Sequence, residues 1–176
     1  MQSEVIKVPL DRVGALVGVK GLTKREIERK AGCRLSIDSE SGEVEVSLGK
    51  GTPLGFLKAL NVVKAIARGF SPERAFELFK EGMVLDVIEL SDVASTSRAR
   101  EHRRGRVIGK KGKARKEIEE NTNALISVYG KTISIIGTEE AIEKARKSVE
   151  LLVHGASHET VFRKLEHGFE EEKFDL

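Results

Sequence analysis

Two short glycine motifs are the residues whose types and spacing point most directly to chemistry. Gly18-Val19-Lys20-Gly21 and Gly109-Lys110-Lys111-Gly112 each place two glycines three residues apart, just ahead of a helix-forming run. Glycine has no Cβ, so the backbone of such a turn can come very close to a ligand. The amides that open the following helix then face outward. Their partial positive charge, together with the lysines of the loop, suits a phosphate group.

The basic residues of the chain are concentrated around the second motif. Residues 98–116 hold ten lysines and arginines and one acid, a local net charge of +9, whereas the whole chain carries +3. Residues 7–25, around the first motif, hold five basic residues and one acid, a local net charge of +4. Such asymmetry around a phosphate-type loop is typical of a nucleic-acid footprint. It predicts that the second motif supplies more of the attraction.

The elements that must position these motifs occur twice, because the sequence contains an internal repeat. A shift of 91 residues, from Gly18 to Gly109, superimposes one motif on the other, and a shift of 86 aligns RGFSPERAF (68–76) with HGASHETVF (154–162). Apolar spacing predicts the same order in each copy: a strand, two short helices around the glycines, a β-hairpin, a long helix and an appended helix. We therefore expect an α+β fold with two domains, 1–82 and 83–176, the second ending in an acidic tail (FEEEKFDL).

The expected elements lie at corresponding positions in the two copies. In the first, we expect strands at 4–9, 33–38 and 43–48 and helices at 23–30, 54–67 and 71–81; in the second, strands at 83–90, 124–129 and 132–137 and helices at 113–120, 139–153 and from 157 onward. Ser71 and Ser157 are the expected N-caps of the appended helices. These helices should dock through apolar side chains, Ala75, Phe76 and Phe79 in one copy and Val161, Phe162 and Leu165 in the other.

Each copy resembles a type I KH domain, which has the order β-α-α-β-β-α and clamps about four nucleotides with a GXXG loop. The resemblance covers nearly the whole chain and implies two tandem type I KH domains, each with an appended C-terminal helix. The chain has no Trp and one Tyr, so bases would lie against an aliphatic groove rather than on aromatic platforms. The expected lining is Val13, Leu16, Val17, Ile27, Leu35 and Ile37 in the first copy and Val107, Ile108, Ile118, Ile126 and Val128 in the second.

The expected RNA-binding residues are the two loops, the basic residues beside them and two groove residues of the second copy. They are Gly18, Val19, Lys20, Gly21, Lys24, Arg25, Arg104, Arg106, Gly109, Lys110, Lys111, Gly112, Lys113, Arg115, Ile126 and Val128. The loops would hold phosphates, and the strand that follows would offer backbone groups to base edges.

A closer family resemblance lies in the second copy. GRVIGKKGKARKEIEENTNALISV (105–128) and HGASHETVFRKL (154–165) resemble the partner-of-Nob family of small-subunit ribosome assembly factors. This resemblance implies an archaeal protein that binds single-stranded RNA near the 3′ end of precursor small-subunit rRNA. The implied partners are the Nob endonuclease and other ribosome-assembly or translation-initiation proteins. Eukaryotic members tend to lack an intact first glycine loop. The intact loop here leaves open whether both copies bind RNA.

Other classes of function find less support. His158-Glu159 begins like a zinc-protease helix, but Phe162 stands where the second histidine is needed, and no complete Gly-x-x-x-x-Gly-Lys-Ser/Thr phosphate loop occurs. We expect no enzyme, no metal and no cofactor. No window approaches the roughly 20 apolar residues of a membrane span, so a cytoplasmic location is expected. A general single-stranded DNA or mRNA binder and a protein-interaction scaffold, which would use the acidic tail, stay as alternatives. Cys33 is the single cysteine, and an alternating segment predicts that it is buried.

Overall fold

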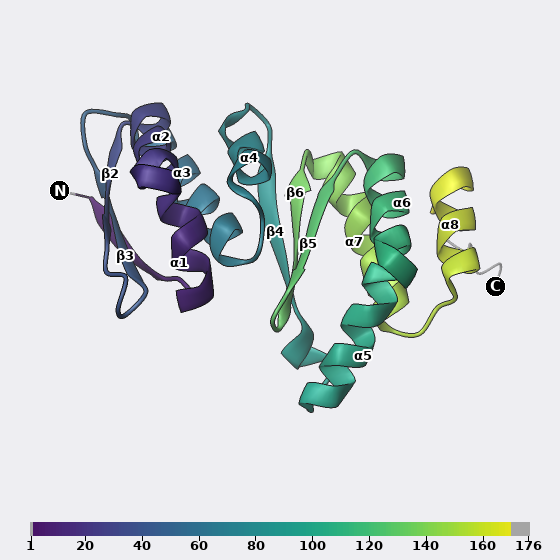
Figure 1. Ribbon diagram of the computed structural model, residues 1–176. Helices are drawn as coiled ribbons and strands as arrows, with labels where there is room; N and C mark the ends of the chain where they lie inside the picture. Colours follow the sequence, from purple (N-terminus) through teal and green to yellow (C-terminus); the bar gives the residue numbers. More distant parts are fainter. Residues whose placement is uncertain (1, 170–176) are drawn as a thin grey trace. The chain divides into compact units, whose positions relative to one another are not determined.

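The computed structural model describes residues 2–169 and contains two compact units, divided between Leu85 and Asp86 (Figure 1). Of the acidic tail expected at 169–176, only Phe169 lies within the described residues. We propose a domain boundary after Gly82 rather than at Leu85, because β4 (Val84–Glu89) belongs as a whole to the second sheet. Gly82 also has a positive φ of 77°, which suits the end of the preceding turn.

The first unit is one antiparallel sheet with helices on one face (Figure 1). Its elements are β1 (Ser3–Lys7), α1 (Leu10–Val17), α2 (Leu22–Ala31), β2 (Cys33–Ile37), β3 (Glu43–Leu48), α3 (Pro53–Ala67) and α4 (Pro72–Ala75). The sheet order is β1-β3-β2, so β2 forms an edge next to the helices that flank the first glycine loop. Alternation in β3 sends Val44 and Val46 into the core, where both are fully buried.

The second unit repeats this architecture. It contains β4, α5 (Ser97–Ile108), α6 (Lys113–Thr122), β5 (Leu125–Tyr129), β6 (Thr132–Gly137), α7 (Glu139–Val153) and α8 (His158–His167). The sheet order is β4-β6-β5, with β5 at the edge. Ile118, Ile133, Ile135 and Val149 are fully buried between sheet and helices. Arg146 on α7 pairs with Asp86 on β4 at 2.6 Å and joins the two elements.

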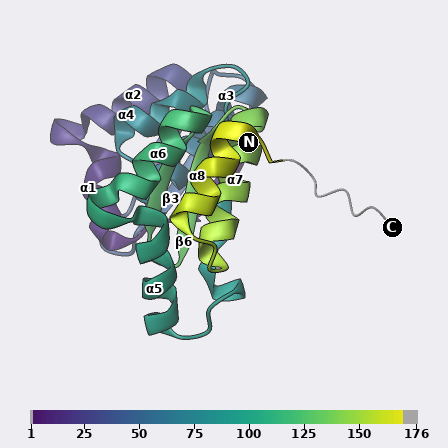
Figure 2. The same cartoon turned by 90° about the vertical axis from the view of Figure 1, so that its right-hand side faces the viewer.

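The expected α+β order of two tandem type I KH domains is confirmed in both units. Ser71 and Ser157 cap the appended helices, their hydroxyls accepting from the amides of Arg74 and Thr160. The appended helix α8 packs against α6 and α7, and it lies beside them in both views (Figures 1 and 2). Its Val161 is fully buried.

The appended helix of the first unit is shorter than predicted. After one turn of α-helix it continues as a 3₁₀ helix, η2 (Phe76–Phe79). With three residues per turn, this geometry brings Phe76 and Phe79 over one another, and their ring centroids lie 5.7 Å apart. The ammonium of Lys30 lies 6.0 Å and 5.9 Å from these two rings. The two rings thus share one cation–π partner.

Helix α5 is longer than the short turn predicted before the second glycine loop. It has 12 residues, whereas α1 has eight. The difference lies at the amino-terminal ends. Pro9 precedes α1 and cannot continue that helix backward, whereas Thr96 caps α5 by accepting from the amide of Ala99 at 3.1 Å.

Candidate nucleic-acid interface

The two glycine loops have the same backbone shape. Gly109 has φ 71° and ψ 177°, and Gly18 has φ 75° and ψ 173°, a region that only glycine occupies readily. A Cβ on Gly109 would lie 2.6 Å from Cβ of Ala114, so the chain turns back tightly onto the following helix. Lys111 and Lys20, the third residues of the loops, both adopt the left-handed conformation with φ 54° and 52°. Sequence repeat and three-dimensional repeat therefore coincide here.

The helices that follow the loops begin with amides that no side chain caps. Within residues 2–169, serine or threonine side chains cap α3, α4, α5, α7 and α8. The α-helices of this range without a side-chain cap are α1, α2 and α6, and the last two start directly after Gly21 and Gly112. The first amide of each helix, of Leu22 and of Lys113, donates to a carbonyl of its own loop, and an anion placed at these two ends would meet the positive end of the helix dipole.

The tips of the two loops differ in chemistry. In the second loop Lys110 and Lys111 are exposed, and neither pairs with an acid among the described residues. Lys113, on the first turn of α6, lies 3.9 Å from Glu117 with its side chain 77% exposed, an ion pair that contributes little. In the first loop the positions of Lys110 and Lys113 are taken by Val19 and Leu22, which are 76% and 59% exposed. The second loop is thus cationic, and the first is largely apolar.

The arginines expected to flank the second loop turn to different sides of α5. Arg104 donates to the carbonyl of Gly130 in the turn between β5 and β6, so it reaches across from α5 to the hairpin. Arg106 donates instead to Leu152, at 2.8 Å, and to Ala156, at the carboxyl end of α7. The guanidinium of Arg106 is therefore engaged away from the loop, and its contact with RNA stays a prediction. Its place on the helix turns it toward α7.

Arg115 is held at the edge strand rather than at the loop. It pairs with Glu119 at 3.1 Å and points one donor at the carbonyl of Ile126. Glu119 also accepts from the amide of Ile126 at 2.8 Å, so this pair engages both backbone groups of Ile126 on the open edge of β5. In an antiparallel pair, outward backbone groups recur every second residue. Val128 therefore presents the next amide and carbonyl on the same edge.

Most of the apolar residues expected to line the grooves lie in the cores instead. Val13, Leu16, Ile27, Leu35, Val107, Ile118 and Ile126 are at most 5% exposed. Their side chains cannot contact RNA, because they face the sheet or the long helix rather than solvent. Val17, Ile37, Ile108 and Val128 are half-buried and stay as groove residues. Ile126 is thus a core residue, and its backbone groups are already engaged by Glu119 and Arg115.

In the first unit, the expected basic residues lie near their loop. Lys24 pairs with Glu28 at 3.6 Å, the counterpart of the pair between Arg115 and Glu119. Arg25 is exposed on the same helix, with its guanidinium next to Gly21. Sequence reasoning missed the acids Glu28 and Glu119. Their spacing of four residues from Lys24 and Arg115 was the available signal.

Removing the charge of Glu119 is expected to weaken the fold slightly and to strengthen RNA binding. Glu119→Gln should lower the free energy of unfolding by about 1 kcal/mol, because the charge-assisted bond to Ile126 becomes a neutral one. It should raise RNA affinity about 3-fold, because an anion leaves the groove edge and Arg115 is released toward phosphate. Urea unfolding and fluorescence anisotropy measure the two effects. Glu28→Gln is the matched control, and a fall in RNA affinity of folded Glu119→Gln would contradict this account.

Groups for other chemistry are sparse in the described chain. Within residues 2–169, no group of three or more His, Cys, Asp and Glu side chains is arranged to hold a metal ion. Cys33 is buried as predicted, and burial raises the pKa of its thiol, so it is a poor nucleophile. Over the same range, no helix is long and apolar enough to cross a membrane.

Comparison with known proteins assigns the family. Residues 84–168 match a family described as eukaryotic type KH-domain (KH-domain type I), and residues 3–65 match the KH domain family. This chain belongs to the KH-domain family. Its first and second KH domains therefore correspond to the two units of the fold.

Several known proteins are similar to this chain over nearly its full length. A KH domain-containing protein of Methanocaldococcus jannaschii is 43% identical over 164 residues, 93% of this chain and 72% of the relative. The crystal structure of Dim2p from Pyrococcus horikoshii has a TM-score of 0.88 and 46% identity, covering 95% of this chain and 99% of that one. The structure of a complex of a/eIF2alpha, aDim2p and rRNA from the same organism has a TM-score of 0.90 and 47% identity, covering 94% and 93%. The resemblance to the partner-of-Nob family is confirmed, because Dim2p is its archaeal homologue.

Proposed function

We propose that this protein binds single-stranded RNA through its GXXG loops and acts as an assembly factor of the small ribosomal subunit. The observation that carries the proposal is the second loop, where a glycine-only turn, the amino-terminal end of α6 without a side-chain cap, and Lys110 and Lys111, which pair with no described acid, converge. Three kinds of anion-binding group at one point suit an RNA backbone, and the KH fold clamps about four nucleotides in this way.

The division of the site into two parts follows from its chemistry. Loop amides and lysines grip phosphates, which carry no sequence information. The edge of β5 offers the amide and carbonyl of Val128 to a base, and Val128 and Ile108 keep half-buried side chains that can line the groove. The RNA-binding set that we propose consists of Gly109, Lys110, Lys111, Gly112, Lys113, Arg104, Arg115 and Val128. In the first domain we propose Gly18, Val19, Lys20, Gly21, Lys24 and Arg25 as a weaker contact.

The similarity to relatives supports a choice of RNA and protein partners for this chain. Its likeness to aDim2p, seen with rRNA and a/eIF2alpha, supports ribosomal RNA and a translation-initiation protein as partners. We propose that the RNA is the 3′ region of precursor small-subunit rRNA and that the Nob endonuclease acts beside it. In this proposal the chain itself binds without catalysing a reaction, takes no cofactor and works in the cytoplasm.

Competition among nucleic acids tests this function. A labelled single-stranded RNA should be displaced by unlabelled RNA of the same sequence, less well by the corresponding DNA and poorly by a duplex. The logarithm of affinity should fall with the logarithm of salt by about 0.7 for each phosphate contact. Equal displacement by DNA would favour a general single-strand binder. No binding of any nucleic acid would favour a protein scaffold.

A further inference from the structure

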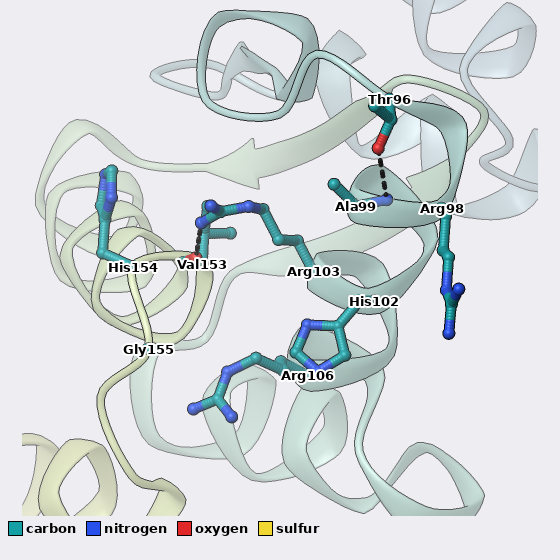
Figure 3. A pocket seen from close by; sticks show the side chains of 9 residues that line it. All are labelled: Thr96, Arg98, Ala99, His102, Arg103, Arg106, Val153, His154 and Gly155. Atoms are coloured by element: carbon teal, nitrogen blue, oxygen red, sulfur yellow. Dashed lines mark hydrogen bonds between the residues drawn. The ribbon is translucent and has the colours of Figure 1, made fainter.

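A basic pocket lies beside α5, on the side away from the edge of β5. It has a volume of about 510 Å³, and Arg98, His102, Arg103, Arg106 and His154 are its basic lining residues, with no carboxylate among the lining (Figure 3). Arg103 and Arg106 extend from α5 toward the corner at 153–155 that follows α7. Arg104 projects to the other side of the helix, toward the hairpin. The pocket is therefore separate from the groove.

One arginine is enough to bind the carbonyl groups at the carboxyl end of the long helix, as the first domain demonstrates. There Arg12 donates to Ile66 at 2.9 Å and to Phe70 at 2.8 Å. In the second domain Arg106 alone makes the corresponding bonds, to Leu152 and Ala156. Arg103 is an additional arginine, which donates to Val153. The fold therefore does not require the other basic residues of the pocket.

The additional basic residues of the pocket have N–H groups that are not engaged by the described chain. Arg98, His102 and His154 are exposed and bond through their side chains to no described residue. Arg103 engages Val153 through one of its five N–H groups. Arg98 comes from the turn by which α5 exceeds α1, so the first domain has no counterpart of it. Several unengaged donors around an open hollow without acids match a phosphodiester oxygen better than any neutral ligand.

We propose that this pocket is a second phosphate-binding site, which holds the RNA backbone where the strand has left the KH groove. The inference rests on the proposed function and extends it beyond the glycine loop. Helix α5 has 12 residues and is about 18 Å long. A strand that advances at least about 3.4 Å per nucleotide spans that length with roughly five nucleotides. An RNA confined to the groove does not reach Arg98, the pocket residue on α5 farthest from the loop, and a longer one does.

Two RNA lengths and two matched variants test the proposal. Anisotropy is measured with fluorescein-labelled oligouridines of about four nucleotides, which fill only the groove, and of about 20 nucleotides. The test variant is Arg98→Glu with His102→Gln. The control variant is Arg163→Glu with His167→Gln, the same change at two exposed positions four apart on α8. All four residues lie exposed on helices, and thermal melts check that both variants stay folded.

The expected result depends on RNA length. The test variant should lose about 10-fold in affinity for the long RNA, with a salt slope shallower by about 1.4 for two lost phosphate contacts. It should bind the short RNA as the unchanged protein does, and the control should match the unchanged protein on both. In the unchanged protein, the ring resonances of His102 should shift with the long RNA alone. An unaltered affinity for the long RNA, an equal loss on the short RNA, or an equal loss in the control would overturn the second site. If the unchanged protein binds neither RNA, the proposed function itself fails.

Discussion

Replacing Lys110 and Lys111 with aspartate is expected to lower the affinity for single-stranded RNA about 100-fold. Both side chains are exposed at the loop tip and make no ion pair with a described residue, so their charge is fully available to phosphate. The change removes two cations and places two anions where phosphate must lie, and a 100-fold loss corresponds to about 2.7 kcal/mol. Aspartate tolerates the left-handed conformation of Lys111, so the loop keeps its shape. Anisotropy with a labelled RNA measures the loss.

The first loop supplies the matched comparison for this prediction. Lys20 has the same backbone conformation as Lys111, with φ 52° against 54°, so Lys20→Asp and Lys111→Asp are the same substitution in the same geometry. We expect about a 10-fold loss for Lys111→Asp and less than about a 3-fold loss for Lys20→Asp, because Lys20 stands beside exposed Val19 rather than a second lysine. Equal losses would refute the division of work between the two domains.

Substituting alanine for Gly109 should destabilise the second domain much more than the same change at Gly112. A Cβ at Gly109 would lie 2.6 Å from Cβ of Ala114 and 2.9 Å from its backbone nitrogen, and the φ and ψ there are open only to glycine. We expect a loss of about 3 kcal/mol in the free energy of unfolding. At Gly112 a Cβ would meet no atom within 4 Å, so only the left-handed conformation costs energy, about 1 kcal/mol.

Urea unfolding monitored by circular dichroism measures both glycine variants. The first domain offers a replicate, because a Cβ on Gly18 would lie 2.3 Å from the hydroxyl of Thr23. Gly18→Ala should therefore destabilise its own domain as Gly109→Ala does. Comparable losses at Gly109 and Gly112 would mean that the turn can relax, and our account of why the first glycine is required would be incorrect.

The sequence was sufficient to predict the repeat, the order of elements and the tight glycine turns of the loops. Glycines three apart before a helix have few structural uses, and their recurrence at one position of two repeated units excludes chance. The spacing of apolar residues also predicted correctly which positions of the strands and helices face inward. Period-two alternation does not say whether a side chain such as Ile126 faces the core or a groove beside it, because both require the same residue types.

The roles of the arginines could not be predicted from a run of basic residues. Within 98–116 almost every second residue is basic, so only the rotation of α5 decides that Arg104 faces the hairpin and Arg106 faces α7. The sequence repeat even predicts the wrong pair of equivalent arginines. A shift of 91 residues pairs Arg12 with Arg103, whereas the bonds made by Arg12 are those of Arg106. Two arginines that lie one helical turn apart can donate to the same carbonyls, because their side chains are long. The sequence therefore does not reveal that Arg106, and not Arg103, is the counterpart of Arg12.

The gathering of cations on α5, the second loop and the start of α6 also governs how the protein meets its ligand. These residues carry +9, and the rest of the chain carries −6, so the positive charge is concentrated in one segment. A polyanion is attracted to this segment while the two molecules are still apart and is repelled by acidic surface elsewhere. Collisions are then biased toward orientations that present the loop, and electrostatically steered encounters reach about 10⁸–10⁹ M⁻¹s⁻¹ at low ionic strength. The acids spread over the remaining surface thus speed capture by disfavouring unproductive approaches, although none of them needs to touch RNA.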